Sequence, residues 1–196
     1  TVDQNGANTH SFVQQAGSNN IADVQLDGAG DGSNVGRTDF NGYYGDPAES
    51  VVVQIGDNQK AYVAQIANSA EANIYQGVEL TAPGTVSLPS SGNTGTINQF
   101  AGADNSRADI YQEGFNNTAT TNQTASASLA EVRQGGTGNA STVGQNEGSL
   151  HQAFVTQTGD GNDSFVTQTG TSNTATVDQF SSDNMSTGTQ GGTGNT

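Results

Sequence analysis

The chain has 196 residues, of which 31% are hydrophobic, 27 are Gly and none is Cys or Trp. This composition is too poor in apolar side chains for an ordinary packed core, and it excludes disulfides and cysteine-based metal sites. A net charge of −15, from 4 Lys or Arg against 19 Asp or Glu, argues against binding to nucleic acid or an anionic membrane, since both would be repelled. Thr1 opens no signal peptide and no run of about 18 apolar residues exists, so we expect no membrane insertion.

Glutamine recurs at intervals of 11 residues along most of the chain. In chain order the positions are Gln4 and Gln15 with Leu26 in the next slot, then Gln54, Gln65 and Gln76, then Gln99, then Gln112, Gln123, Gln134 and Gln145, and finally Gln157, Gln168, Gln179 and Gln190. The longer steps between these blocks predict insertions at about 27–49 and 77–92. Pro47, Pro83 and Pro89 all fall in these insertions, as expected if the repeated segments are paired strands.

Each glutamine ends a segment with strand periodicity. Alternate residues are small or β-branched, as in Ala72-x-Ile74-x-Gln76, and this period of two is typical of a half-buried strand. A glycine usually follows two residues after the glutamine, where a tight turn needs positive φ. These turn glycines are Gly17, Gly56, Gly114, Gly136, Gly159 and Gly170. The sequence therefore predicts an arm of about seven strand residues followed by a turn.

Alternate arms begin differently, so the full unit has 22 residues. One set begins with Asn20, Gln59, Asn93, Asn117, Asn139, Asn162 and Asn184, and the other mostly with Ser, Ala or Thr. Strand, turn, strand, turn makes one coil, and about seven coils fit the chain. We expect an all-β fold, a single β-solenoid domain over residues 1–196 whose coils stack about 4.8 Å apart in a cross-β arrangement.

One unit matches a known pattern at every defined position. Ser106-x5-Gln112-x-Gly114-x2-Asn117-x-Ala119-x3-Gln123 resembles the curlin repeat of curli fibre subunits, and the resemblance extends over nearly the whole chain. Departures are His151 and Asn173 for the leading Ser, Ser181 for a turn Gly, Leu26 for a closing Gln and Gln59 for an Asn. The resemblance implies a non-enzymatic subunit of an extracellular, cell-surface amyloid fibre in a biofilm or adhesive matrix, without a cofactor. It also implies secretion through an outer-membrane channel and nucleation by a related minor subunit.

Inward amides are the expected assembly positions. Gln and Asn can each bond to a copy above and below, whereas a buried column of Glu would place like charges at layer spacing. The predicted ladder positions are Gln15, Asn20, Gln54, Gln65, Gln76, Gln99, Gln112, Asn117, Gln123, Gln134, Asn139, Gln145, Gln157, Asn162, Gln168, Gln179, Asn184 and Gln190. Since the chain begins within an arm and ends in a turn, we expect open strand edges and head-to-tail self-association.

Outward positions are expected to carry the charged residues and to be exposed to solvent. They include Glu71, Asp109, Glu131, Arg133 and Asp178. The same phase places Tyr75 and Tyr111 in successive coils, where the rings would stack.

Other functions have weaker sequence support. His10 is expected to point outward and His151 into the ladder, and neither belongs to a nucleophile motif.

The segments 27–34 and 160–163 are rich in Asp, Asn and Gly and suit calcium, but these are also ordinary turn residues. Outward Thr96, Thr120, Thr142 and Thr187 are compatible with ice binding, although Tyr62 and Phe165 interrupt their column. A monomeric adhesin displaying the aromatic segment 40–44 is the main alternative to a fibre subunit.

Overall fold

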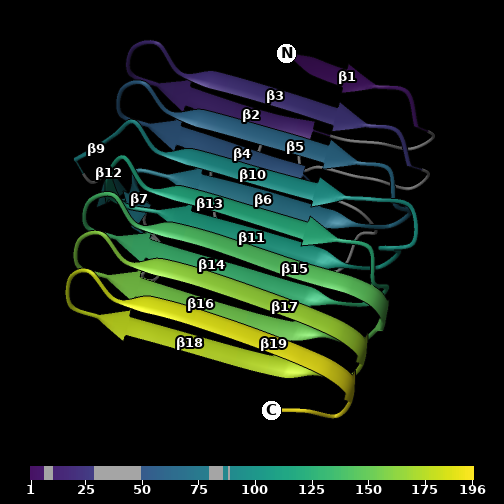
Figure 1. Cartoon of the computed structure of the whole chain (residues 1–196). Helices are drawn as coiled ribbons and strands as arrows, with labels where there is room; N and C mark the ends of the chain where they lie inside the picture. The colour runs from purple at the N-terminus through teal and green to yellow at the C-terminus, as the bar shows by residue number, and fades with distance from the viewer. Residues whose placement is uncertain (7–10, 29–49, 80–85, 88) are drawn as a thin grey trace.

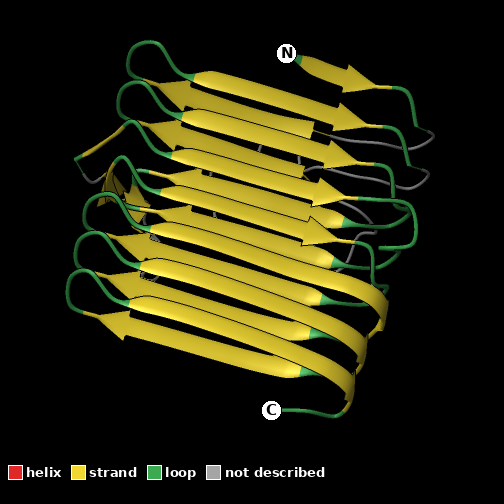
Figure 2. Ribbon diagram, in the orientation of Figure 1, coloured by secondary structure: helices red, strands yellow, loops and turns green. Residues whose placement is uncertain are grey.

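The computed structural model describes residues 1–6, 11–28, 50–79, 86–87 and 89–196. Successive long strands belong alternately to two parallel sheets that pack face to face (Figures 1 and 2). Sheet A has eight strands, in order β1 (Val2–Gln4), β3 (Ile21–Leu26), β5 (Lys60–Gln65), β10 (Thr94–Gln99), β13 (Thr118–Gln123), β15 (Ala140–Ser149), β17 (Asp163–Thr171) and β19 (Met185–Thr193). Sheet B has seven, in order β2 (Ser11–Ala16), β4 (Ser50–Ile55), β6 (Glu71–Gln76), β11 (Arg107–Gln112), β14 (Leu129–Gly135), β16 (Gln152–Thr158) and β18 (Thr174–Phe180). The predicted all-β solenoid of about seven coils is confirmed.

The register keeps equivalent repeat positions directly above one another. Gln112 pairs with Gln134 across β11 and β14, and Gln123 pairs with Gln145 across β13 and β15. Alternate residues point between the sheets, so each coil contributes small and β-branched side chains such as Ala108, Ile110 and Val132 to one continuous thin core. Because the core is a column of thin layers, few apolar residues are needed in each coil.

The turns require two residues with positive φ, of which the sequence pattern predicted one. The six predicted glycines have φ between 81° and 119°, and a Cβ on any of them would lie 2.0 to 2.3 Å from a carbonyl oxygen of the neighbouring coil. A second such residue usually precedes the first residue of the next arm, for example Asn116 (φ 56°), Gly138 (φ 70°) and Leu150 (φ 60°). Asn and Gly adopt this conformation readily, whereas Leu does so at a cost.

The second predicted insertion adds short strands beside the stack. β7 (Val78–Glu79) and β8 (Val86–Ser87) pair antiparallel, while β9 (Ser90–Ser91) pairs in parallel with β12 (Gly114–Phe115). β9 and β12 extend the turn region of the neighbouring coils. Most of the first insertion, with Pro47 and the aromatic segment 40–44, lies outside the described residues, as do Pro83 and His10.

Candidate functional site: the polar ladders

Seven glutamines form an unbroken ladder along sheet B. The amide Nε2 of each glutamine donates to the Oε1 of the glutamine in the next coil, at 2.6 to 2.9 Å, from Gln15 through Gln54, Gln76, Gln112, Gln134 and Gln157 to Gln179. All these bonds run in the same direction, from the earlier coil to the later one. The repeat period thus places a donor and an acceptor at every step.

Sheet A carries a second glutamine ladder that starts one coil later. It runs from Gln65 through Gln99, Gln123, Gln145 and Gln168 to Gln190, with Nε2–Oε1 distances of 2.8 to 3.1 Å. Leu26 lies in register with Gln65 and has no amide to offer. As a result, the buried Oε1 of Gln65 has no hydrogen-bond partner, so the departure from the repeat at Leu26 is a local defect.

The second amide hydrogen of each glutamine ties the two sheets together. Gln112 Nε2 also donates to the backbone oxygen of Thr94 (3.0 Å), and Gln134 Nε2 to that of Thr118 (2.9 Å). In each case the bond joins sheet B to the preceding strand of sheet A. The amide therefore satisfies its neighbours along the stack and across it, which a carboxylate without donors could not do.

Asparagines form a column at one edge of the stack. Asn117 Oδ1 accepts from the backbone N–H of Asn139 (2.9 Å), and Asn139 Oδ1 accepts from that of Asn162 (2.9 Å). The amide nitrogen of Asn139 donates to the turn carbonyls of Gly135 (3.0 Å) and Gly159 (2.8 Å). Each asparagine thus holds its own turn and the turn of the next coil.

A mixed column performs the same task at the opposite edge. Ser128 N–H donates to Ser106 Oγ (3.0 Å), His151 N–H to Ser128 Oγ (3.1 Å) and Asn173 N–H to His151 Nδ1 (3.4 Å). The His151 ring is fully buried, and its Nε2 lies 3.0 Å from the backbone oxygen of Glu147. Ser, His and Asn replace one another in this column because each supplies an acceptor to the following backbone N–H.

Most of the 18 predicted ladder residues are enclosed between the sheets. Fourteen are buried. The other four lie in coils near the ends of the stack: Asn20 and Gln190 are partly exposed, and Gln15 and Asn184 are exposed. The sheet B ladder thus runs from one end strand of its sheet to the other, whereas the sheet A ladder begins at Gln65, after Leu26.

Acidic turn residues also link adjacent coils, a role that the spacing of the repeats does not predict. Asp57 accepts from the N–H of Ser18 (2.7 Å), and Asp160 accepts from that of Thr137 (2.8 Å). Each of them directly follows a turn glycine, so the Gly-Asp pair is the sequence feature that could have indicated this role. This role also accounts for Asp160 in one of the two segments considered for calcium.

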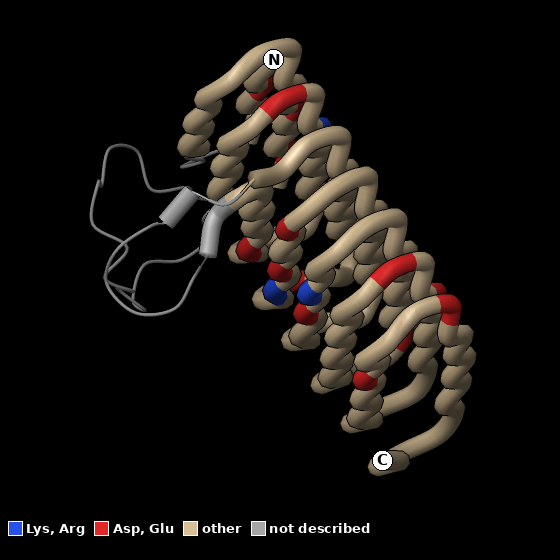
Figure 3. The backbone as a smooth tube through the Cα atoms, turned by 90° about the vertical axis from the view of Figure 1, so that its left-hand side faces the viewer, with Lys and Arg blue, Asp and Glu red and all other residues tan. Residues whose placement is uncertain are grey.

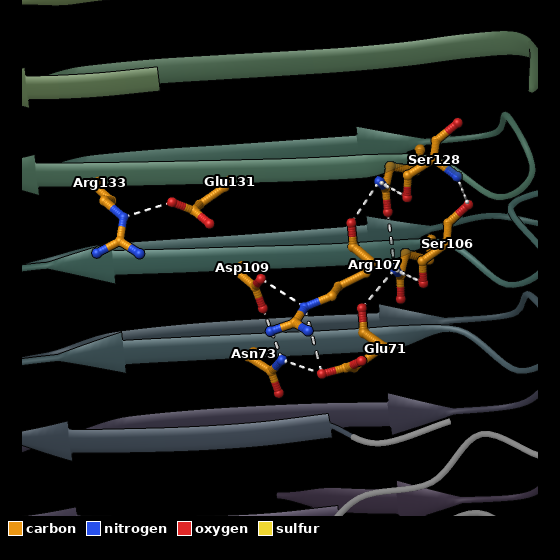
Figure 4. A network of polar contacts seen from close by, with 10 residues as sticks. Glu71, Asn73, Ser106, Arg107, Asp109, Ser128, Glu131 and Arg133 are labelled. Atoms are coloured by element: carbon orange, nitrogen blue, oxygen red, sulfur yellow. Dashed lines mark hydrogen bonds and ion pairs between the residues drawn. The ribbon is translucent and has the colours of Figure 1, made fainter. Parts of the chain in front are cut away.

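A charged network covers part of the outer face of sheet B (Figure 4). Arg107 Nε lies 2.7 Å from Asp109 and 3.6 Å from Glu71, and Asn73 donates to both carboxylates at 2.8 Å. Arg133 bonds to Glu131 at 2.6 Å. The expectation that Asp109 is solvent-exposed is wrong: it is 2% exposed, because the neighbouring columns of long side chains close over it.

Burial and stacking mark this patch as structural. Burial raises the pKa of Asp109 above its ordinary value, against the opposing effect of the Arg107 guanidinium. The rings of Tyr75 and Tyr111 stack as predicted, with centroids 5.2 Å apart and planes 6° apart, and burial raises the pKa of both. The Arg133 guanidinium lies 4.6 Å from the centre of the Tyr111 ring. The network therefore reinforces the stacking of adjacent coils.

Among the described residues, no three His, Asp or Glu side chains gather in a way that would hold a metal ion. Within the same residues, no helix is long and apolar enough to cross a membrane. The segment 27–34 lies mostly outside the described residues, as does the aromatic segment proposed for an adhesin.

Comparison with known protein families gives one match. The family model described as the curlin associated repeat matches residues 102–134, 126–159 and 147–170. No curated protein matches the chain. The strands before and after the matched residues pair in the same register, as Gln76 with Gln112 and Gln168 with Gln190 show. The same repeat geometry therefore continues on both sides of the matched segment.

Proposed function

Since residues 102–170 of this chain are curlin repeats and the neighbouring coils continue their register, we propose that it is a structural subunit that polymerises head to tail into an extracellular cross-β fibre. In this proposal the fibre contributes to a biofilm matrix, to adhesion or to surface attachment. The nucleating subunit and the export channel implied by the resemblance to curli subunits are part of the same proposal.

The two glutamine ladders are the observation that supports this function. From Gln65 onward, each coil presents the same glutamine donors and acceptors to the coil that follows it. A coil of a second copy presents these groups again, so it can extend both sheets without new chemistry. Because all the glutamine amides donate toward the later coil, the added copy should bind with its first coil against the last coil of the stack.

Backbone groups in the last coil point in the direction of growth. Asp163 N–H donates to the backbone oxygen of Asn184 in the next coil (2.8 Å), and alternate residues of a parallel strand bond to opposite neighbours. Thr187 lies in register with Phe165, two residues beyond Asp163. Its N–H therefore points away from β17, toward the position that an added strand would occupy.

The substitution Thr187→Pro tests this geometry. Proline removes the outward N–H and blocks pairing on that side, and it is tolerated in edge strands. We expect the variant to fold with the circular dichroism of the wild type but to elongate wild-type seeds at least about fivefold more slowly, the factor set by a backbone hydrogen bond worth about 1 kcal/mol. Thr187→Ala keeps the N–H and should elongate normally.

The assay is dilution from denaturant, followed by thioflavin fluorescence, electron microscopy and fibre diffraction. The wild type should form filaments that grow faster when seeded and give a meridional reflection near 4.8 Å, the usual strand spacing. A stable β-rich monomer that seeds do not extend would contradict the proposal and would favour a monomeric solenoid that displays its inserted segments.

A further inference from the structure

The outer faces of the two sheets differ in charge. Outward positions of sheet B on β6, β11 and β14 carry Glu71, Arg107, Asp109, Glu131 and Arg133, and Figure 3 shows acidic and basic segments side by side along one side of the stack, with further acidic segments at the turns. On sheet A, the outward positions of β10, of β13 and of residues 140–145 of β15 are all Thr, Asn, Ala or Gly. We call these outward positions of β10, β13 and β15 the neutral face.

The neutral face is flat and accessible. β10 pairs with β13, and β13 with β15, residue for residue without a bulge through the face. Its side chains are short, and Asn98 donates to Asn122 at 2.9 Å within one column. None of its residues is buried, in contrast to Asn73 (3% exposed) and Asp109 (2%) on the outer face of sheet B. It therefore lacks the overlying contacts that close the opposite face.

Charge selects the partner that this face fits. With a net charge of −15, two copies of the chain repel when they approach through their acidic turns or charged columns. Short, uncharged side chains let two sheets pack face to face at about 10 Å, as in cross-β assemblies. We propose, on the basis of the proposed fibre, that neighbouring fibres pack side by side through the neutral face, each covering the neutral face of a second copy.

Two exposed aromatic residues make the contact self-complementary. Tyr62 (37% exposed) and Phe165 (45% exposed) lie in the same outward column as Thr120, each two strands away from β13 on opposite sides. A twofold axis parallel to β13 over Thr120 would bring Tyr62 of one copy opposite Phe165 of the other, and Phe165 opposite Tyr62. Such a reciprocal match is what an isologous contact requires.

The size of the face explains why it acts in fibres. The neutral face spans the three strands β10, β13 and β15 and measures about 14 Å by about 20 Å at ordinary strand dimensions, or about 280 Å², less than the roughly 800 Å² per partner of a stable interface. A single pair of subunits should therefore associate weakly. In a fibre the contact repeats with every subunit, so the association becomes multivalent and strong.

The experiment compares the same substitution on the two outer faces. Thr120→Glu puts a charge in the centre of the neutral face. Thr156→Glu is the matched control, because Thr156 points outward from β16 of sheet B between Arg133 and Asp178 and is likewise partly exposed. Filaments of both variants and of the wild type are measured by electron microscopy for width, and by fibre diffraction for the strand reflection near 4.8 Å.

We expect wild-type and Thr156→Glu filaments to bundle, and Thr120→Glu filaments to stay single while keeping the strand reflection. Salt at about 1 M, where charges are screened beyond about 3 Å, should restore bundling of Thr120→Glu. Bundling of all three proteins alike, or single filaments of all three, would overturn the neutral face as the contact and leave the fibre proposal intact. Failure of all three to give filaments or the reflection would overturn both.

Discussion

Replacing Gln123 with Glu changes one atom in the middle of the sheet A ladder. The Gln123 side chain is fully buried. Its Nε2 donates to Gln145 Oε1 (2.8 Å) and to the backbone oxygen of Arg107 (2.9 Å). A carboxylate can donate to neither, so two buried acceptors lose their donor and face a negative charge.

The size of the effect follows from these contacts. Each deprived buried acceptor costs about 1 to 3 kcal/mol, so Gln123→Glu should lower the free energy of unfolding by about 4 kcal/mol at pH 7. When the new carboxyl is protonated it donates to one acceptor again, and the loss falls to about 2 kcal/mol. The difference of about 2 kcal/mol raises the pKa of this carboxyl by about 1.5 units in the folded chain, from about 4.3 to about 6.

The sign of the pH dependence follows from that shift. Below about pH 4.3 the carboxyl is protonated in both the folded and the unfolded chain, so the loss is smallest. As the pH rises toward about 6, the unfolded chain ionises first and stability falls, and above about pH 6 the loss is constant. The variant should therefore be less stable relative to the wild type at pH 7 than at pH 4.

Urea unfolding followed by circular dichroism at pH 4 and pH 7 measures the effect. Gln123→Glu and its control are studied at low concentration without seeds in the Thr187→Pro background, which slows polymerisation in the proposed fibre. Gln152→Glu is the matched control, since Gln152 points outward and is exposed and should lose less than about 0.5 kcal/mol. A loss below about 1 kcal/mol at pH 7, or a loss independent of pH, would refute the assignment of Gln123 as a two-way donor.

Three further substitutions test the turns and the outer network by the same urea assay. Gly136→Ala places a Cβ 2.1 Å from a carbonyl oxygen at φ 106° and should lower the free energy of unfolding by more than about 3 kcal/mol. The control Gly138→Ala, where a Cβ would meet open space, should lower it by about 1 kcal/mol. Equal losses would contradict the close approach of adjacent coils. Leu150→Asn relieves a 55% exposed residue at φ 60° and should stabilise by about 0.5 to 1 kcal/mol, so destabilisation would count against strain there. Arg107→Met should cost about 2 kcal/mol after allowance for the partly exposed guanidinium. Because burial raises the pKa of Asp109, this loss should shrink as the pH falls. It should also be smaller in an Asp109→Asn background, where only the longer contact with Glu71 remains; a loss that grows in acid would exclude the ion pair as its cause.

The strands and ladders were predictable because both follow from spacing. The alternation in Ala72-x-Ile74-x-Gln76 identifies an inward face, and β6 spans Glu71–Gln76. Steps of 22 residues then place each glutamine directly above another, as Gln112 above Gln134. In a parallel stack the period alone determines the partner.

Other features depend on neighbours that the period does not specify. Alternation shows that Asp109 points outward, but its burial depends on the side chains of Arg107 and Asn73 beside it. The positive φ of Leu150 is invisible in the sequence because Leu has no preference for that conformation. The unpaired Oε1 of Gln65 follows from Leu26, a departure that the sequence identified without showing its cost.

The ladders have a consequence for the evolution of chain length. In a globular domain all segments share one core, and the fraction of surface that is buried depends on the size of the domain. Loss of an internal segment therefore disrupts contacts throughout the domain. Here the hydrogen bonds of Gln134 reach only the adjacent coils, through Gln112, Gln157 and Thr118. Deleting or duplicating a whole coil would rejoin equivalent surfaces, since β11 meets β14 in the same register in which β14 meets β16. The number of coils is therefore free to vary by duplication or loss, while the sequence within each coil is constrained by its two neighbours.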